Sequence, residues 1–309
     1  MKEKLLHILK ASPEELYPLL TQAFKLKVKN FGNFIETCAI VNAKSGLCPS
    51  DCKFCAQSAR FNVKVKTYSL LEEGELYAAA LKAYERGINR FSFVISGISP
   101  TKEDLKAIGR VIEKLKAKNE RFKVCASLGQ LRREELKFLK ECGLDRYHHN
   151  LETSREFYPK IATQQRWEDR LKTVERAKEV GLSTCCGGIF GLGESDEDVV
   201  SLAKTLKELQ VDSVPVNFLH PIKGTPLEGA NYLTPLKCLK ILTALRFAMP
   251  KAQIRVCGGR EYNLRELQPL ALLPVDSLMV GNYLTTKGRS LKDDAQMIKD
   301  LGFKTTLKP

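Results

Sequence analysis

Three regularly spaced cysteines are the residues best suited to chemistry in this sequence. Cys48, Cys52 and Cys55 form a C-x3-C-x2-C motif, with Phe54 between the last two cysteines. Thiolates hold iron–sulfur clusters, and three of them can bind a four-iron cluster while leaving one iron open to a small molecule. A structural zinc site takes four protein ligands, and no further cysteine or histidine lies beside the motif. The motif therefore favours a reactive iron–sulfur site over a zinc site.

The spacing, with its internal aromatic residue, resembles the cluster motif of the radical S-adenosylmethionine superfamily. In that superfamily the open iron binds S-adenosylmethionine, and an electron from the cluster releases a 5′-deoxyadenosyl radical. The resemblance implies a 4Fe-4S cluster and S-adenosylmethionine as cofactors, with Phe54 beside them. The motif alone indicates a superfamily and leaves the reaction open.

The composition describes a chain that can bury a large core. The chain has 309 residues, of which 43% are hydrophobic, enough for one large barrel. No long apolar run and no signal peptide are visible, so we expect a cytoplasmic protein without membrane contact. The ten cysteines then indicate metal binding rather than disulfides. The net charge of +14 permits nucleic-acid binding, but Lys and Glu alternate along the expected helices, which indicates a solvated surface and no nucleic-acid partner.

Short apolar runs alternate with helical periodicity from residue 35 onward. The expected strands are 35–42, 90–95, 122–127, 145–150, 183–190, 213–218, 252–257 and 275–280. The expected helices are 70–86, 101–118, 132–142, 166–180, 195–209, 234–248, 260–271 and 290–302. Eight strand-then-helix units predict an α/β fold of the (β/α)8 TIM type. An amphipathic stretch at 4–28 predicts a helical extension over residues 1–30, followed by one barrel domain over 31–309.

Polar and thiol side chains gather at the expected strand ends, where the functional residues of such barrels lie. They are Cys48, Cys125, Asn150, Glu152, Cys185, Asn217, Arg255 and Cys257. Side chains alternate between the two faces of a strand. The neighbours of Cys125, Arg255 and Asn217 along each strand are apolar and are expected to face the helices. These three side chains are therefore predicted to point into the barrel.

The cysteines outside the motif fall into two groups. Cys125, Cys185 and Cys257 are candidates for a second iron–sulfur site inside the barrel, because buried polar groups need partners. Cys186 should face away from Cys185 in a regular strand, although a bulge would reverse it. The other three are expected to act as small buried hydrophobic residues, as free cysteines commonly do: Cys38, Cys142 and Cys238.

Longer segments resemble the biotin synthase family, in order from about residue 30 to the C-terminus. They are CPSDCKFCAQS (48–58), YHHNLET (147–153), CCGGIFGLGE (185–194), VPVN (214–217), KGTP (223–226), GRE (259–261) and YLTT (283–286), together with Arg255. The resemblance implies an enzyme that inserts sulfur into dethiobiotin to form biotin. It implies that the adenosyl radical removes hydrogen from dethiobiotin and that a second cluster donates the sulfur.

The second cluster site departs from the family's pattern. The resemblance implies a 2Fe-2S cluster on three cysteines and one arginine, and it assigns Cys125, Cys185 and Arg255 to catalysis and metal binding. The remaining cysteine belongs on the second strand, where this chain has Ser92, and serine is a poor ligand for such a site. We therefore predict a site rebuilt around Cys125, Cys185 and Cys257. Cys186 and Arg255 are alternatives for a further ligand of a larger cluster.

The resemblance also implies small-molecule contacts, for which ordinary loop capping is the alternative interpretation. A carboxylate commonly holds the two hydroxyls of a ribose. The residues implied for S-adenosylmethionine are Asn150, Glu152, Gly187, Gly188 and Ile189. Those implied for dethiobiotin are Asn150, Asn217, Thr285 and Thr286. His148 stands where the family pattern leads us to expect asparagine.

Two other functions stay open from the sequence alone. One is a different radical enzyme on the same barrel, of the hydrogenase-maturation or amino-acid-rearranging kind, and Ser92 favours it. The other is a non-catalytic iron–sulfur or zinc protein. The family resemblance further implies flavodoxin or ferredoxin as electron donor and a homodimer.

Overall fold

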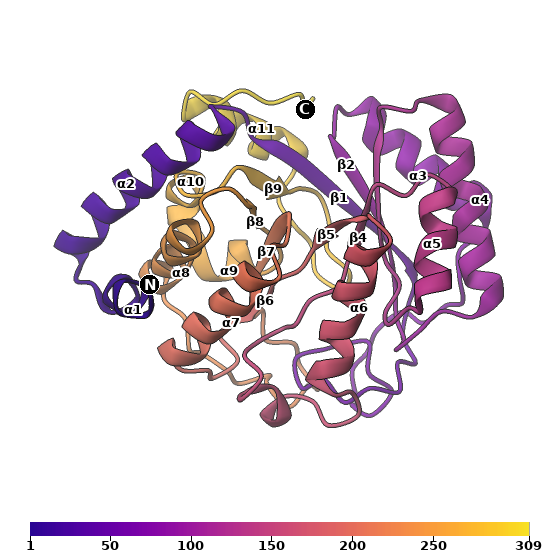
Figure 1. The fold of residues 1–309 in the computed structure, drawn as a ribbon, viewed down its shortest axis with the longest axis horizontal. Helices are drawn as coiled ribbons and strands as arrows, with labels where there is room; N and C mark the ends of the chain where they lie inside the picture. Colours follow the sequence, from indigo (N-terminus) through magenta and orange to yellow (C-terminus); the bar gives the residue numbers. More distant parts are fainter. Residues whose placement is uncertain (309) are drawn as a thin grey trace.

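The computed structural model describes residues 1–308, and its centre is a closed barrel of parallel strands (Figure 1). The strands are β1 (Glu36–Lys44), β2 (Arg90–Ile95), β3 (Lys123–Ser127), β4 (Arg146–His148), β5 (Ser183–Cys185), β6 (Gly188–Phe190), β7 (Ser213–Phe218), β8 (Gln253–Val256) and β9 (Ser277–Met279). Their order is β5-β4-β3-β2-β1-β9-β8-β7-β6, and β5 also pairs with β7. Because β5 and β6 are two halves of one interrupted strand, the barrel has the eight strand positions that the sequence predicts.

Helices follow the strands and cover the outside of the barrel (Figure 1). They are α3 (Glu73–Glu85), α4 (Lys102–Lys118), α5 (Arg133–Glu141), α6 (Trp167–Glu179), α7 (Asp196–Glu208), α8 (Pro235–Ala248), α9 (Arg260–Leu264), α10 (Gln268–Ala271) and α11 (Leu291–Asp300), with short 3-10 turns η1 (Tyr158–Lys160) and η2 (Arg265–Leu267). The expectation of a single helix over 260–271 was wrong. Arg265 adopts a positive φ of 49° there, which separates α9 from η2 and α10.

Two helices precede the barrel, α1 (Lys2–Lys10) and α2 (Pro13–Phe31). Ser12 caps α2 by accepting from the amide of Glu15, whose side chain accepts from the amide of Ser12 at 2.8 Å; this reciprocal pair satisfies two free amides. Both helices pack against α8. The helical extension is therefore confirmed, while the division into domains 1–30 and 31–309 stays a prediction.

Charged groups are buried where the extension meets the barrel. The ammonium of Lys27 has no hydrogen-bond partner among the described residues and lies 3.7 Å from the centre of the Phe303 ring. Burial lowers the pKa of Lys27 to about 8. Nearby, the guanidinium of Arg246 is fully buried and pairs with the carboxylate of Asp276. The extension thus covers a polar part of the barrel wall.

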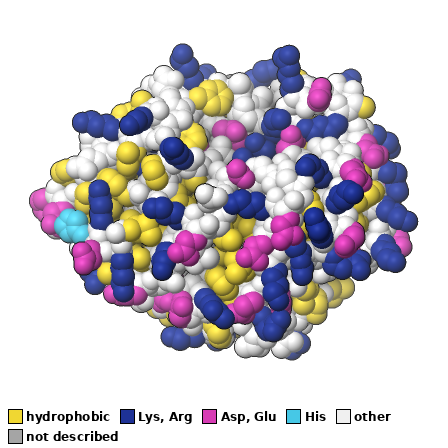
Figure 2. All heavy atoms as spheres, in the orientation of Figure 1, with side chains coloured by type: hydrophobic (Ala, Val, Ile, Leu, Met, Phe, Trp, Pro, Cys, Tyr) yellow, Lys and Arg dark blue, Asp and Glu magenta, His cyan; other side chains and the backbone are white. Residues whose placement is uncertain are grey.

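The surface carries both signs of charge. Figure 2 shows lysines and arginines spread over the visible face, with Asp and Glu side chains between them. This mixture agrees with the solvated surface expected from the sequence. Within residues 1–308, no helix combines the length and apolarity required to cross a membrane.

Candidate active site

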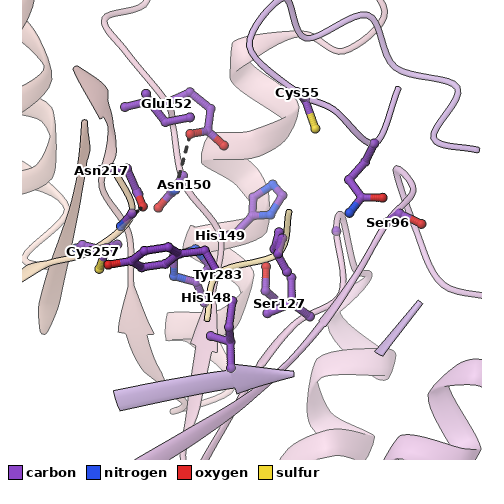
Figure 3. Close-up of a pocket in the computed structure, with 18 of the residues that line it drawn as sticks. Cys55, Ser96, Ser127, His148, His149, Asn150, Glu152, Asn217, Cys257 and Tyr283 are labelled. Atoms are coloured by element: carbon purple, nitrogen blue, oxygen red, sulfur yellow. Dashed lines mark hydrogen bonds between the residues drawn. The ribbon is translucent and has the colours of Figure 1, made fainter. Parts of the chain in front are cut away.

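One cavity of about 360 Å³ brings together most of the predicted site residues (Figure 3). It is lined by strand residues of the barrel and by residues of the loops that follow the strands. The predicted residues lining it are Cys48, Cys52, Phe54, Cys55, Cys125, Asn150, Glu152, Cys185, Ile189, Asn217, Arg255, Cys257 and Thr285. Four predicted or candidate residues do not line it, namely Cys186, Gly187, Gly188 and Thr286.

The motif cysteines lie on a loop after β1, which we call the cysteine loop (residues 48–55). Its backbone is fixed by its own hydrogen bonds, because the amide of Cys48 donates to Gln57 O at 2.9 Å and the amide of Cys55 to Cys52 O at 2.9 Å. The carboxylate of Asp51 ties the loop to the region after β4 by accepting from the amide of Thr163 at 2.9 Å. All three thiols are free of disulfides. A rigid loop therefore presents three thiols to one cavity.

The donor set and its surroundings fit a bound cluster with a small-molecule ligand. Burial, with Cys52 adding to it, raises the pKa of Cys55 to about 12, so the thiol gives up its proton only when metal replaces it. Three buried nitrogens of cavity residues lack hydrogen-bond partners in the described part of the chain: Gln57 Nε2, His149 Nε2 and Arg170 Nε. Buried polar atoms are seldom left unpaired, so this cavity is built for a polar occupant.

Glu152 and Asn150 form a polar pair in the cavity wall, across the cavity from Cys55 in Figure 3. Asn150 Nδ2 donates to Glu152 Oε2 at 3.3 Å, and Arg170 Nη2 on α6 donates to Glu152 Oε1 at 2.9 Å. The two residues do not share a strand face as expected, because β4 ends at His148 and Glu152 has a positive φ of 71°. The backbone turn at Glu152 brings the side chains of Asn150 and Glu152 together instead. Arg170 was missed, because nothing in the pattern of its helix distinguishes it from a surface arginine.

Gly187 and Gly188 allow close backbone packing in the barrel wall and do not line the cavity. A Cβ on Gly187 would lie 2.1 Å from the carbonyl oxygen of Pro215, and one on Gly188 would lie 2.2 Å from that of Glu152. Only glycine fits such close backbone contacts. The amide of Gly187 donates to Asn150 Oδ1 at 3.1 Å, so the interrupted strand orients Asn150. Gly187, Gly188 and Ile189 were all predicted to contact S-adenosylmethionine, but of these three only Ile189 lines the cavity.

Cys125, Cys185, Cys257 and Arg255 line the cavity from the strands, and we call this group the inner site. Their inward direction agrees with the predicted alternation. Arg90 Nη1 lies 3.6 Å from Cys125 Sγ, and Arg255 Nη1 lies 3.8 Å from Cys185 Sγ. Cys125 and Cys185 lie on separate strands, and Cys257 directly follows β8. Among the described residues, no three His, Cys, Asp or Glu side chains are close enough together to hold a single metal ion.

The electrostatics of the inner site favour a thiolate at Cys185. Burial alone would raise its pKa, but the charge and hydrogen bond of His148, followed by Arg255 and Arg146, bring the pKa down to about 6. A thiolate is the form that binds iron. His148 pairs with Cys185 across β4 and β5, so the residue that departs from the family pattern acts directly on this thiol.

The other cysteines are placed as follows. Cys186 is buried among core side chains outside the cavity, as the regular strand predicts. Cys142 and Cys238 are buried away from the cavity too. Cys38 is buried as expected, but unlike Cys142 and Cys238 it also lines the cavity, together with the inner site.

Asn217 and the loop after β9 line the side of the cavity (Figure 3). Asn217 Oδ1 accepts from the amide of Gly258 at 3.2 Å, and its Nδ2 donates to Gly188 O at 3.3 Å. Thr285 lines the cavity, whereas Thr286 lines a neighbouring one. Tyr283 was missed from the sequence; it lines the cavity, and its hydroxyl is held by Glu261 at 3.0 Å.

Solved structures share this fold. A methylornithine synthase superposes with a TM-score of 0.85 at 21% identity, covering 99% of this chain and 94% of that one. The FeFe-hydrogenase maturase HydG from Carboxydothermus hydrogenoformans gives 0.84 at 21% identity, covering 98% of this chain and 75% of that one. At these identities the likeness confirms the barrel fold and leaves the reaction open.

Two family models together match most of the chain. The Radical SAM superfamily model matches residues 44–206, and the Biotin and Thiamin Synthesis associated domain matches residues 215–304. The first covers the cysteine loop and the Asn150–Glu152 pair, and the second covers Asn217, Arg255 and the loop after β9. The match to the Radical SAM superfamily implies a four-iron cluster and S-adenosylmethionine as cofactors.

Curated relatives are similar over nearly the full length. A biotin synthase of Aquifex aeolicus (strain VF5) is 48% identical, covering 97% of this chain and 91% of the relative. A biotin synthase of Geobacillus thermodenitrificans (strain NG80-2) is 45% identical, covering 99% of this chain and 92% of the relative. A biotin synthase of Bacillus subtilis (strain 168) is 44% identical, covering 97% of this chain and 90% of the relative. The chain therefore belongs to the biotin synthase family of the radical S-adenosylmethionine superfamily.

Proposed function

We propose that this protein converts dethiobiotin to biotin by radical sulfur insertion. The single observation that carries the proposal is that one cavity holds two separate sets of thiols, the cysteine loop and the inner site. When bound, a cluster on the cysteine loop supplies the electron that cleaves S-adenosylmethionine, and one on the inner site supplies the sulfur. The protein itself contributes positioning and the exclusion of water.

The cysteine loop and the Asn150–Glu152 pair would hold the first cluster and S-adenosylmethionine. Cys48, Cys52 and Cys55 leave one iron without a protein ligand. Glu152, fixed by Arg170 at 2.9 Å, is placed to accept hydrogen bonds from ribose hydroxyls. Phe54 and Ile189 give apolar surface on the cavity wall, which suits the adenine ring.

Dethiobiotin would lie between the two sets of thiols. Its cyclic urea offers both donors and acceptors, and the amides of Asn150 and Asn217 match this chemistry. Thr285, which lines the cavity, would bind the carboxylate at the far end of the molecule. Thr286 lies outside this cavity, so only its backbone is proposed for that role. The inner site would hold the second cluster on Cys125, Cys185 and Cys257, with Arg255 against it.

The electron donor and the oligomer belong to the same proposal. A net charge of +14 favours encounter with an acidic carrier such as flavodoxin or ferredoxin. The homodimer is supported by the family resemblance alone. Gel filtration with light scattering tests it, and a monomeric mass would contradict it.

An anaerobic incubation with dethiobiotin, S-adenosylmethionine and a reductant tests the function. We expect both 5′-deoxyadenosine and biotin, read by mass spectrometry. A different radical enzyme would give 5′-deoxyadenosine without biotin, and a non-catalytic metal protein would give neither. Cys52→Ala should abolish both products, whereas Cys142→Ala, which removes a buried thiol outside the cavity, should leave them unchanged.

A further inference from the structure

Cys38 is a fourth cysteine directed at the inner site. It lies on β1, its side chain is 2% exposed, and it lines the same cavity as Cys125, Cys185 and Cys257. We propose that the second cluster is held by four thiolates, from these four cysteines, and that Arg255 is a hydrogen-bond donor to the cluster rather than an iron ligand. This inference rests on the proposed function, because it concerns the cluster that supplies the sulfur.

The register of the barrel places Cys38 between the other ligands. On one side it pairs with Met279 of β9, and β9 is flanked on its other edge by β8, which carries Arg255 and leads directly into Cys257. On the other side it pairs with Arg90 of β2, whose guanidinium contacts Cys125. Cys38 thus closes the ring of thiols on the side where the expected cysteine of β2 is missing.

The position of Ser92 explains why Cys38 can replace that missing cysteine. Ser92 pairs with Ile40 on β1 and with Cys125 on β3, and all three side chains line the cavity. Ile40 and Cys38 are two residues apart, so they share the inward face of β1. The thiol absent at Ser92 is therefore supplied by the adjacent strand, one inward position earlier.

Arg255 is engaged by the protein at all three guanidinium nitrogens. Nε donates to Ser277 Oγ at 2.8 Å, and Nη2 donates to Gln253 Oε1 at 2.8 Å and to Glu36 at 3.3 Å. Only Nη1 is directed at the inner site, towards Cys185 Sγ. A guanidinium remains protonated in proteins, so this arrangement suits a donor to sulfur better than a ligand to iron.

The charges beneath the thiols fit an anionic cluster with four thiolates. Arg90, Arg146 and Arg255 are all buried, and Glu36 is the carboxylate that pairs with two of them, at 3.2 Å and 3.3 Å. Three guanidinium groups against one carboxylate leave an excess of positive charge in a low-dielectric site. A four-thiolate cluster would supply the matching negative charge.

Iron binding tests the proposal in a background that lacks the first cluster. The triple variant Cys48→Ala, Cys52→Ala, Cys55→Ala confines iron to the inner site, and iron and sulfide per chain are measured after anaerobic reconstitution, together with the Mössbauer spectrum. We expect Cys38→Ser to lose at least half of this iron, and we expect the same of Cys125→Ser. Cys142→Ser and Arg255→Met should retain it, the latter with an altered spectrum.

Each outcome bears on a different claim. Retention of iron and an unchanged spectrum in Cys38→Ser would overturn the four-thiolate site while leaving the proposed function intact. Loss of iron in Arg255→Met but not in Cys38→Ser would make Arg255 the ligand and overturn it as well. A folded triple variant without any iron would overturn both this inference and the proposed sulfur donor.

A second variant separates ligation from folding. Circular dichroism first establishes whether Cys38→Ser is folded. Adding Ser92→Cys to it places a thiol beside Cys125 on the neighbouring strand, and we expect bound iron to return. The proposal is wrong if Cys38→Ser loses its iron only because it unfolds, or if a folded Cys38→Ser does not regain iron with Ser92→Cys.

Discussion

Replacing Glu152 by glutamine is the sharpest perturbation of the proposed S-adenosylmethionine site. The carboxylate is buried and already receives one hydrogen bond from Arg170 at 2.9 Å and one from Asn150 at 3.3 Å. Glutamine keeps the size of the side chain, but it removes the negative charge and half of the acceptor capacity. The variant thus tests the charge while preserving the shape of the cavity.

The expected loss can be worked out from these contacts. A hydrogen bond to a charged group contributes about 1.5–3 kcal/mol, and about 1.4 kcal/mol corresponds to tenfold in affinity. We therefore expect Glu152→Gln to raise the Kd for S-adenosylmethionine by about 10-fold to 100-fold. Stability should also fall, because Arg170 would keep its buried charge without a counterion.

Anaerobic calorimetry with S-adenosylmethionine on protein carrying the first cluster measures the change. Iron content is measured in parallel, so that loss of cluster is separated from loss of ribose contacts. The matched control is Glu168→Gln, which removes a carboxylate on the same helix as Arg170 but from an exposed pair with Arg155; such pairs contribute little. A less than twofold change in Kd for Glu152→Gln, with iron intact, would refute this role for Glu152.

Three further predictions concern the substrate and the fold. Asn217→Ala should raise the KM for dethiobiotin roughly tenfold with little change in S-adenosylmethionine binding, because one neutral amide contact of about 1 kcal/mol or more is lost; steady-state kinetics measure it. Lys27→Met should stabilise the protein at pH 7 by up to about 3 kcal/mol, since the folded pKa of about 8 lies well below the usual value of 10.5 and each unit is worth about 1.4 kcal/mol. Asp276→Asn should cost about 3–5 kcal/mol in urea unfolding, because the buried charge of Arg246 loses its partner.

The pH dependence fixes the sign of the Lys27 prediction. Between pH 8 and 10.5 the unfolded chain binds more protons at this lysine than the folded protein, so its contribution makes stability rise with pH. The gain from Lys27→Met should therefore be full below pH 8 and vanish near pH 10.5. A gain that grows with pH would contradict the buried-charge explanation. An unchanged KM for dethiobiotin in Asn217→Ala would contradict the substrate role of that amide.

The barrel could be predicted from the sequence because its units are short and regular. Strand and helix signals alternate from residue 35 to the end, and each expected strand lies over an observed one. Inward direction was readable at Cys125 and Arg255, since each alternates with small or apolar residues. The three motif cysteines needed only their spacing.

What could not be predicted depends on contacts between distant segments. Residues 38–41 of β1 are apolar on both faces of the strand, so this run gives no sign of which way Cys38 points. The pairing of Asn150 with Glu152 depends on a positive φ at Glu152, and Arg170 reaches it from the middle of a helix. Thr285 lines the cavity and Thr286 does not. The two residues lie in a turn in which Tyr283 N donates to Thr286 O at 3.0 Å, a local geometry that the segment YLTT does not specify.

The central claim is that sulfur carried by this protein's inner site ends up in biotin. Protein reconstituted anaerobically with ³⁴S-sulfide, freed of excess sulfide and given dethiobiotin, S-adenosylmethionine and a reductant, measures this directly in one turnover. The account predicts biotin that carries ³⁴S, formed together with 5′-deoxyadenosine. Unlabelled biotin, or 5′-deoxyadenosine without biotin, would contradict it.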